Sequence, residues 1–233
     1  MRHYQHKITN FTPKASIFHK IMANIIFAVS IIKYKRRKNY LTEKDYRRSK
    51  KFIRLGDLIL VGNHRQVSSV FIGGIFTHAI LYAGKNSIIH TTGDGVEKIS
   101  YKDLFDEYDT LLIMRPKKID SKKAKLAIEF AKKQIDKPFN FELATLSPKD
   151  DQERFFCTQL VHASYQFANI DIDIKSSINN SGIMALPMRP NKFINNKFDI
   201  VYVSKSIRKH VHGRFTLNNK IYRERLLKYI LNF

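Results

Sequence analysis

Short apolar segments separated by turn-forming residues constrain the fold of this chain most strongly. Each segment is four to seven residues long, and turn-forming triplets such as Gly84-Lys85-Asn86 and Gly93-Asp94-Gly95 stand between them. Segments of this length, bounded by such residues, are typical of β-strands joined by hairpins. The pattern predicts an antiparallel sheet whose strands occupy residues 58–61, 77–83, 87–91, 96–100, 111–115 and 198–203.

Apolar residues recur at helical spacing in two stretches after the fifth predicted strand. The first follows a candidate N-cap, Asp120 or Ser121, and its apolar face comprises Ala124, Ala127, Ile128, Ala131 and Ile135. The second starts at or just before Cys157, and one stripe of it holds Cys157, Leu160, Val161, Ser164 and Ala168. A further helix is expected around residues 217–231. Together with the sheet, these helices predict an α+β fold.

The chain carries 42 Lys and Arg against 20 Asp and Glu, and most of its net charge of +22 lies in two arms. Residues 33–54 hold eleven basic and two acidic residues, and residues 204–233 hold eight basic and one acidic. Such charge suits anionic partners such as lipid headgroups, nucleic acid or wall polymers. Alternatively, an AT-rich coding sequence favours Lys, Ile and Asn codons, and the added lysines would give the same positive charge without any binding partner.

An apolar run at residues 21–32 precedes the first arm. Its twelve residues are fewer than the ~20 that cross a bilayer, and basic residues replace the cleavage site of a signal peptide. We therefore expect a cytoplasmic or membrane-associated protein. Ile17, Ile21, Ile25, Val29 and Ile32 share a helical face. Docking of this helix on the domain is favoured over contact of residues 17–54 with an anionic membrane surface.

One cysteine and nine histidines make a thiol–imidazole pair possible. If residues 84–86 form a three-residue loop, Ile80 faces His90, and His78 and His90 then point to one face of the hairpin. Their Cβ atoms would lie roughly 5.5–7 Å apart as diagonal neighbours. Cys157 at a helix start would have free N–H groups nearby, which favour the thiolate. If its helix packs on the histidine face, a Cys–His–His set assembles; otherwise Cys157 is a small buried apolar residue.

The remaining polar residues predict no cofactor or metal site. A single cysteine excludes a disulfide scaffold and a thiolate-rich zinc or iron–sulfur site. Neither a phosphate-cradling glycine loop nor zinc-ligand spacing is present. Asp57 is expected to anchor a strand by accepting backbone hydrogen bonds. Surface or packing roles are expected for His64, His162, His210 and His212.

Six segments together resemble the NlpC/P60 papain-like superfamily, in its circularly permuted branch of YiiX/YebB-like proteins. They are GDLIL at 56–60, FTHAILYAG at 76–84, IIHTTGDGV at 88–96, DKPFNFE at 136–142, FFCTQLVHASY at 155–165 and ALPMRP at 185–190. His78 precedes Cys157, as in the permuted branch. The resemblance implies Cys157 as nucleophile, His78 as base and His90 as the third polar residue, a position where permuted relatives often carry Glu.

The resemblance also implies the architecture and the activity. Residues 55–203 would form a permuted papain-like catalytic domain, with an antiparallel sheet packed against helices. Residues 1–54 would add an apolar helix and a polybasic extension, and residues 204–233 a basic helical extension. The implied activity is that of a cysteine-dependent hydrolase or acyltransferase, which forms an acyl-enzyme on Cys157. Its substrate would be a peptide, cell-wall or lipid-derived acyl compound.

A catalytically silent module remains the alternative. Its basic arms would bind anionic lipid or nucleic acid. We do not expect a nucleic acid partner, because the aromatic residues in the arms follow no recognised nucleic-acid-binding pattern.

Overall fold

The computed structural model describes residues 11, 16–30, 32–33, 38–67, 69, 74–139, 154–173 and 189–207. The helices are α1 (Ile17–Ser30), α2 (Glu43–Ser49), α4 (Leu104–Glu107), α5 (Ser121–Lys133) and α6 (Cys157–Phe167), with 3-10 turns at Tyr101–Asp103 and Pro190–Phe193. The strands are β1 (Leu58–Gly62), β2 (His78–Gly84), β3 (Ser87–Thr92), β4 (Gly95–Ser100), β5 (Thr110–Pro116) and β6 (Phe198–Val203).

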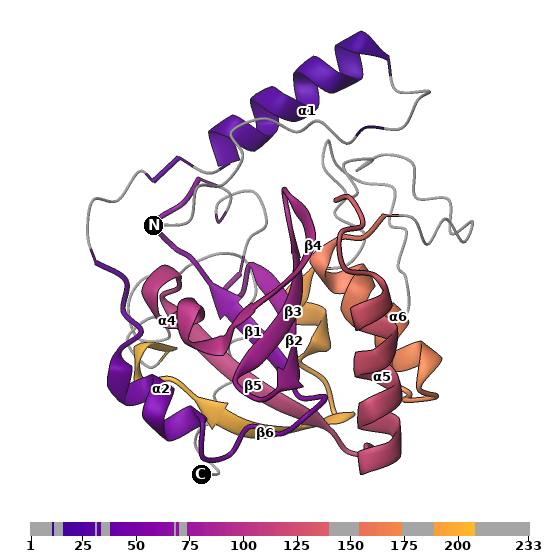
Figure 1. Ribbon diagram of the computed structural model, residues 1–233. Coiled ribbons are helices and arrows are strands. Elements are labelled where there is room, and N and C mark those ends of the chain that lie inside the picture. The colour runs from indigo at the N-terminus through magenta and orange to yellow at the C-terminus, as the bar shows by residue number, and fades with distance from the viewer. Residues whose placement is uncertain are drawn as a thin grey trace.

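The strands form one sheet in the order β4-β3-β2-β1-β5-β6, and every neighbouring pair is antiparallel (Figure 1). Each strand coincides with one of the predicted apolar segments to within one or two residues. The predicted antiparallel sheet and the α+β class are therefore confirmed.

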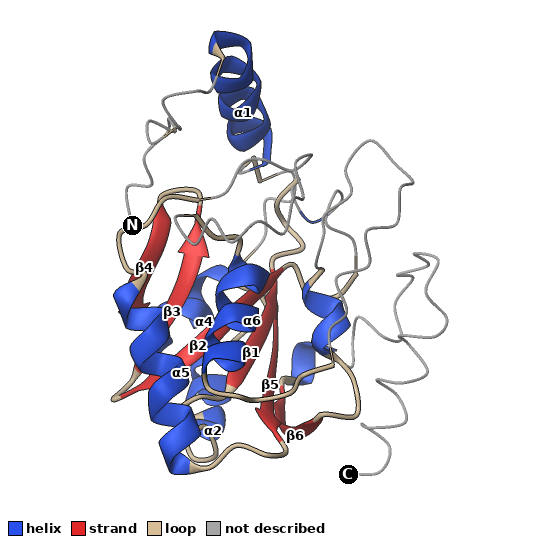
Figure 2. Cartoon of the chain, turned by 90° about the vertical axis from the view of Figure 1, so that its right-hand side faces the viewer, coloured by secondary structure: helices blue, strands red, loops and turns tan. Residues whose placement is uncertain are grey.

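Both faces of the sheet are buried, because side chains alternate along each strand. On β1, Leu58 and Leu60 belong to the core shared with α5 and α6, which cover one face (Figure 2). Ile59 and Val61 point the other way and pack with residues of α2 and α4. The central strands consequently read as continuous apolar runs rather than as alternating ones.

The two helices on the first face begin where the sequence predicts. The Asp120 side chain accepts a hydrogen bond from the Lys123 backbone N–H at 2.7 Å, which caps α5. The helix at the cysteine starts at Cys157 itself. The hydroxyl of Tyr165 on α6 donates to the Gly56 carbonyl at 2.8 Å and ties this helix to the start of β1. The helix predicted at 217–231 lies outside the described residues, as does the extension beyond residue 207.

Asp57 anchors the start of β1, as its position predicts. Its buried carboxylate accepts a hydrogen bond from the Arg54 backbone N–H at 2.8 Å. Two more come from the Arg115 guanidinium, both at 2.8 Å. Arg115 lies on β5, beside β1, and also donates to the Phe52 carbonyl. The ion pair therefore ties the chain that enters the sheet to a neighbouring strand.

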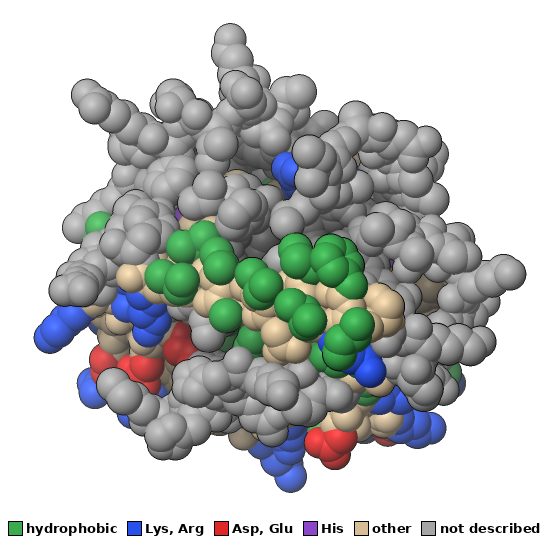
Figure 3. Space-filling model, turned by 90° about the horizontal axis from the view of Figure 1, so that it is seen from above, with side chains coloured by type: hydrophobic (Ala, Val, Ile, Leu, Met, Phe, Trp, Pro, Cys, Tyr) green, Lys and Arg blue, Asp and Glu red, His purple; other side chains and the backbone are tan. Residues whose placement is uncertain are grey.

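Helix α1 docks through a different face from the one that the apolar spacing predicts. The predicted stripe is 41–75% exposed and lies on the surface in Figure 3: Ile17, Ile21, Ile25, Val29 and Ile32. Phe27 instead touches the turn between β3 and β4, where a Cβ on Gly93 would come within 2.0 Å of the phenylalanine ring. Across the described part of the chain, no helix is long and apolar enough to cross a bilayer.

Candidate active site

His78 begins β2, His90 lies near the end of β3, and their rings meet on one face of the hairpin. Nε2 of His78 lies 3.0 Å from Nδ1 of His90, within hydrogen-bond distance. The His90 side chain is almost completely buried. The predicted juxtaposition of the two histidines is confirmed.

A β-bulge in β2 brings the two histidines together. The sequence pattern did not predict this bulge. The turn contains two residues, 85–86, and both have positive φ, as a tight hairpin turn requires. With regular strands, a two-residue turn would place the histidines on opposite faces of the sheet. The register shifts between Tyr82 and Gly84 instead. Beyond the shift Leu81 pairs with Ile89, the register expected from a three-residue loop.

Glu97 on β4 is a further polar group beside His90, and it is not among the candidate residues from the sequence. It pairs with His90 across the two strands, and its Oε1 lies 3.2 Å from Nε2 of His90. This is an ion-pair distance, although the alignment falls short of hydrogen-bond geometry. The Thr92 hydroxyl donates to the same oxygen at 3.3 Å. A two-residue turn at 93–94 is the signal that predicts this pairing.

Helix α6 presents Cys157 to the histidine-bearing strands. The helix packs against β2 and β3. Leu160, Val161 and Ser164 of the predicted stripe are buried in this contact. Because Cys157 lies on the same stripe, its side chain is directed toward the sheet.

The sulfur of Cys157 lies beside the first residues of β2. The backbone N–H groups of Ala79, Thr158 and Cys157 lie close enough to the sulfur to favour its charged form. Ala79 directly follows His78 in the strand. The structure thus brings the predicted nucleophile to the peptide unit that joins His78 to Ala79.

Burial decides the protonation of the thiol and of the imidazole. It raises the pKa of Cys157 to about 11, although the three N–H groups favour the thiolate. Burial, and then the neighbouring His90, hold the pKa of His78 well below 6.5. Both groups are therefore neutral near pH 7. The N–H groups at the helix start favour the thiolate, as expected, but desolvation opposes them and the net shift of the Cys157 pKa is upward.

We expect iodoacetamide to alkylate Cys157 slowly at neutral pH. With a pKa of about 11, on the order of one thiol in 10⁴ is ionised near pH 7, against a few per cent for an unperturbed cysteine. Mass spectrometry of the labelled protein should show a rate about 10- to 100-fold below that of free cysteine. The rate should rise about tenfold per pH unit between about pH 6 and pH 9. A plateau in this range would instead indicate a stable thiolate–imidazolium pair.

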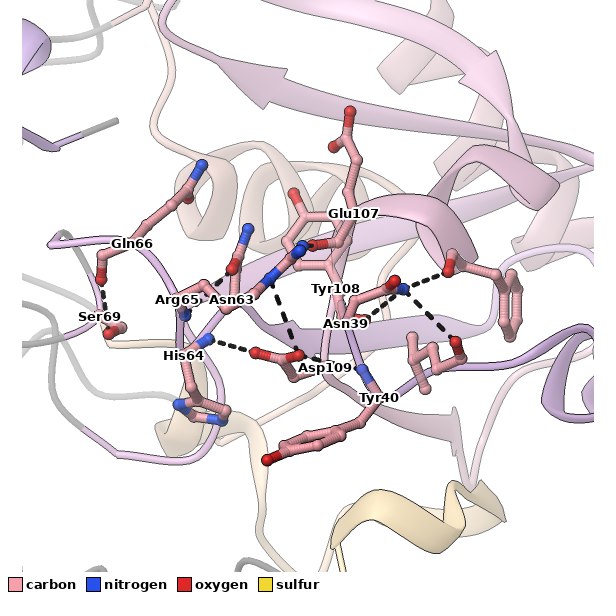
Figure 4. A network of polar contacts seen from close by, with 12 residues as sticks. Asn39, Tyr40, Asn63, His64, Arg65, Gln66, Ser69, Glu107, Tyr108 and Asp109 are labelled. Carbon is pink, nitrogen blue, oxygen red and sulfur yellow. Dashed lines mark hydrogen bonds and ion pairs between the residues drawn. The ribbon is translucent and has the colours of Figure 1, made fainter. Parts of the chain in front are cut away.

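Tyr108, directly after α4, stacks on His78. The ring centroids are 6.2 Å apart and the planes are 4° from parallel. Its neighbour Asp109 is fully buried and accepts hydrogen bonds from the backbone N–H groups of His64 at 2.9 Å and Tyr40 at 3.1 Å. Figure 4 shows Tyr108 within this polar network. The network holds the chain in place beside the candidate base.

The other histidines singled out in the sequence form no metal site in the described part of the chain, where no group of three metal-binding side chains occurs. His64 is buried and His162 is half-buried, and burial lowers the pKa of His162. His210 and His212 lie outside the described residues.

A family model described as "Permuted papain-like amidase enzyme, YaeF/YiiX, C92 family" matches residues 53–184, more than half of the chain. The match includes both histidines and the cysteine. No curated protein and no solved structure matched in the corresponding searches.

Proposed function

Because the chain belongs to the permuted papain-like amidases of the YaeF/YiiX type, the C92 family, we propose that it hydrolyses amides through a covalent acyl-enzyme on Cys157. The observation that carries the proposal is the position of the Cys157 sulfur, which lies close to the backbone N–H of Ala79 beside His78. His78 is the base of the proposed reaction, and His90 and Glu97 position it.

The proposed proton arrangement starts from Glu97. The negative charge of a carboxylate 3.2 Å from Nε2 of His90 favours the tautomer that has its proton on that nitrogen. In that tautomer Nδ1 of His90 has a lone pair, which accepts the Nε2 proton of His78. This tautomer of His78 has its lone pair on Nδ1. The arrangement leaves that nitrogen to take the thiol proton from Cys157.

In the proposed first half-reaction, the thiol proton moves to His78 as the sulfur attacks the carbonyl carbon of the substrate. The carbonyl π electrons move onto oxygen, and backbone N–H groups at the start of α6 stabilise this oxyanion. His78 then gives its proton to the leaving nitrogen. The carbon–nitrogen bond breaks, an amine departs, and the acyl group stays on Cys157.

In the second half-reaction, His78 removes a proton from water, and the hydroxide attacks the thioester carbon. Collapse of the tetrahedral species breaks the carbon–sulfur bond and releases a carboxylic acid. The returning proton restores the Cys157 thiol. An amine or alcohol in place of water would make the same intermediate the donor of an acyl transfer, so the acceptor alone separates hydrolase from acyltransferase.

Trapping the acyl-enzyme tests this proposal. The protein is incubated with p-nitrophenyl acetate and quenched in acid, and intact-mass and peptide analyses follow. We expect one acetyl group per chain, located on Cys157, and none in the Cys157→Ala variant. The Ser164→Ala variant is a matched control, because Ser164 shares the helix and bonds only within it, to the Leu160 carbonyl. Acetylation that persists in Cys157→Ala at the rate of the unchanged protein would contradict the proposal.

A further inference from the structure

Helix α1 and Ile32, just after it, carry an exposed apolar stripe. Among the described residues, ten large apolar side chains are exposed, and seven of them lie on this segment: Ile17, Phe18, Ile21, Met22, Ile25, Val29 and Ile32. Most are four residues apart and so share one side of the helix, which Figure 3 shows as a continuous row. A clustered apolar surface of this kind marks an interaction site.

The sequence that contains and flanks the stripe carries charge of one sign. The first 42 residues contain nine Lys or Arg and no Asp or Glu. Five of the nine lie at positions 33–38, directly after the helix. Two copies of such a segment repel each other, which disfavours a pair of α1 helices. Nucleic acid would satisfy the charge, but six of the seven exposed side chains lack an aromatic ring on which bases could stack. Anionic lipid satisfies both the charge and the apolar stripe.

The helix is fixed to the end of the sheet that holds the candidate site. Phe27 rests on Gly93, in the turn after the strand of His90. The Ile32 carbonyl accepts a hydrogen bond from the Val67 backbone N–H at 3.0 Å. Figure 1 shows α1 above this end of the sheet, and α2 at the opposite end.

We propose that α1 lies in the plane of a membrane surface rich in anionic lipid, with the stripe from Ile17 to Ile32 inserted among the acyl chains. Its 14 residues span about 21 Å, which suits an interfacial helix and not a crossing of the ~30 Å hydrocarbon core. The surface would then lie next to His90 and its partners. If the proposed function also holds, substrates embedded in that surface are within reach of Cys157.

A single tryptophan tests the orientation of the helix. The chain contains no Trp, so Ile25→Trp and Phe52→Trp each carry one reporter. Phe52 is as exposed as Ile25 but follows α2. With vesicles of phosphatidylglycerol and phosphatidylcholine, we expect emission of Ile25→Trp to shift to shorter wavelength and that of Phe52→Trp to stay unchanged. The same shift in both variants, or none in Ile25→Trp, would overturn the proposal.

Sedimentation with the same vesicles measures affinity. The protein should bind at least about tenfold more tightly to anionic than to pure phosphatidylcholine vesicles, and salt at ~1 M should remove most of this difference. Ile25→Glu should weaken binding about tenfold or more, whereas Phe52→Glu, with the same charge change, should bind as the unchanged protein does. Cys157→Ala should bind normally, which separates this result from the proposed function.

Two outcomes would contradict the lipid assignment. The first is equal binding to both kinds of vesicle, which would show that charge does not contribute to membrane binding. The second outcome has two parts: the unchanged protein does not bind vesicles, and Ile25→Glu changes the oligomeric state in analytical ultracentrifugation. This result would assign the stripe to contact with a second copy of the chain.

Discussion

Replacing His78 with alanine is expected to lower kcat/KM for hydrolysed acyl substrates by about 10²–10⁴-fold. The thiol of Cys157 is protonated at neutral pH, because burial raises its pKa to about 11. Attack therefore requires a base at the moment of reaction, and His78 is the proposed base, since it directly precedes Ala79, whose backbone N–H reaches the sulfur. Steady-state kinetics measures the loss, and circular dichroism checks that the variant keeps its fold.

A graded series distinguishes this base from the groups that position it. His90→Ala should cost roughly 10- to 1000-fold in rate, because it removes the partner of the His78 ring without removing the base. His90→Gln and Glu97→Gln should retain more activity than His90→Ala, since an amide can still hydrogen-bond in place of the lost group. The two variants should also shift the pH–rate profile. Equal and complete loss in all of these variants, with intact folds, would mean that His78 is not the base.

Asp57→Ala should lower the free energy of unfolding by about 3–5 kcal/mol, the usual cost of removing one partner of a buried ion pair. The Asp57 side chain is about 1% exposed and that of Arg115 is 25% exposed. The alanine variant would leave the guanidinium without its carboxylate and the Arg54 backbone N–H without its acceptor. Urea unfolding followed by circular dichroism measures the change.

Asp57→Asn is the matched comparison. Burial raises the pKa of Asp57 despite the hydrogen bonds from Arg115, so the fold disfavours the charged carboxylate relative to the neutral group. Asparagine should therefore cost clearly less than alanine, because its oxygen can still accept from the Arg54 N–H. Losses below about 1 kcal/mol in both variants would show that the pair lies outside the cooperatively folded core.

The six strands and the helices α5 and α6 were predicted from the sequence, because local signals specify them, whereas α2 and α4 were not predicted. Apolar segments between glycine-containing turns located the strands, and a capping aspartate located the start of α5 at Ser121. The Cys157 helix followed from a stripe of small and aliphatic residues. The sequence also predicted that His78 and His90 lie on one face of the hairpin. The prediction assumed a three-residue loop, whereas the structure has a two-residue turn and a β-bulge.

Other properties depend on how elements pack, which local patterns do not encode. Helix periodicity showed that α1 has an apolar stripe but not that Phe27 on another side makes the contact with Gly93. The N–H groups around Cys157 were predictable from a helix start, whereas the desolvation that overrides them comes from the enclosing protein. The stacking of Tyr108 on His78 joins residues that no sequence periodicity relates.

The protonated state of Cys157 also bears on how the protein withstands oxidation. Peroxide reacts with thiolates, so the upward shift of the Cys157 pKa slows oxidation of the sulfur to sulfenic acid. The chain contains no second cysteine that could capture such a sulfenic acid as an internal disulfide. Protection therefore depends on slow oxidation at the first step, and repair on small thiols such as glutathione entering the site. Once oxidation reaches the sulfinic acid, inactivation of the nucleophile is permanent in the absence of a dedicated reductase.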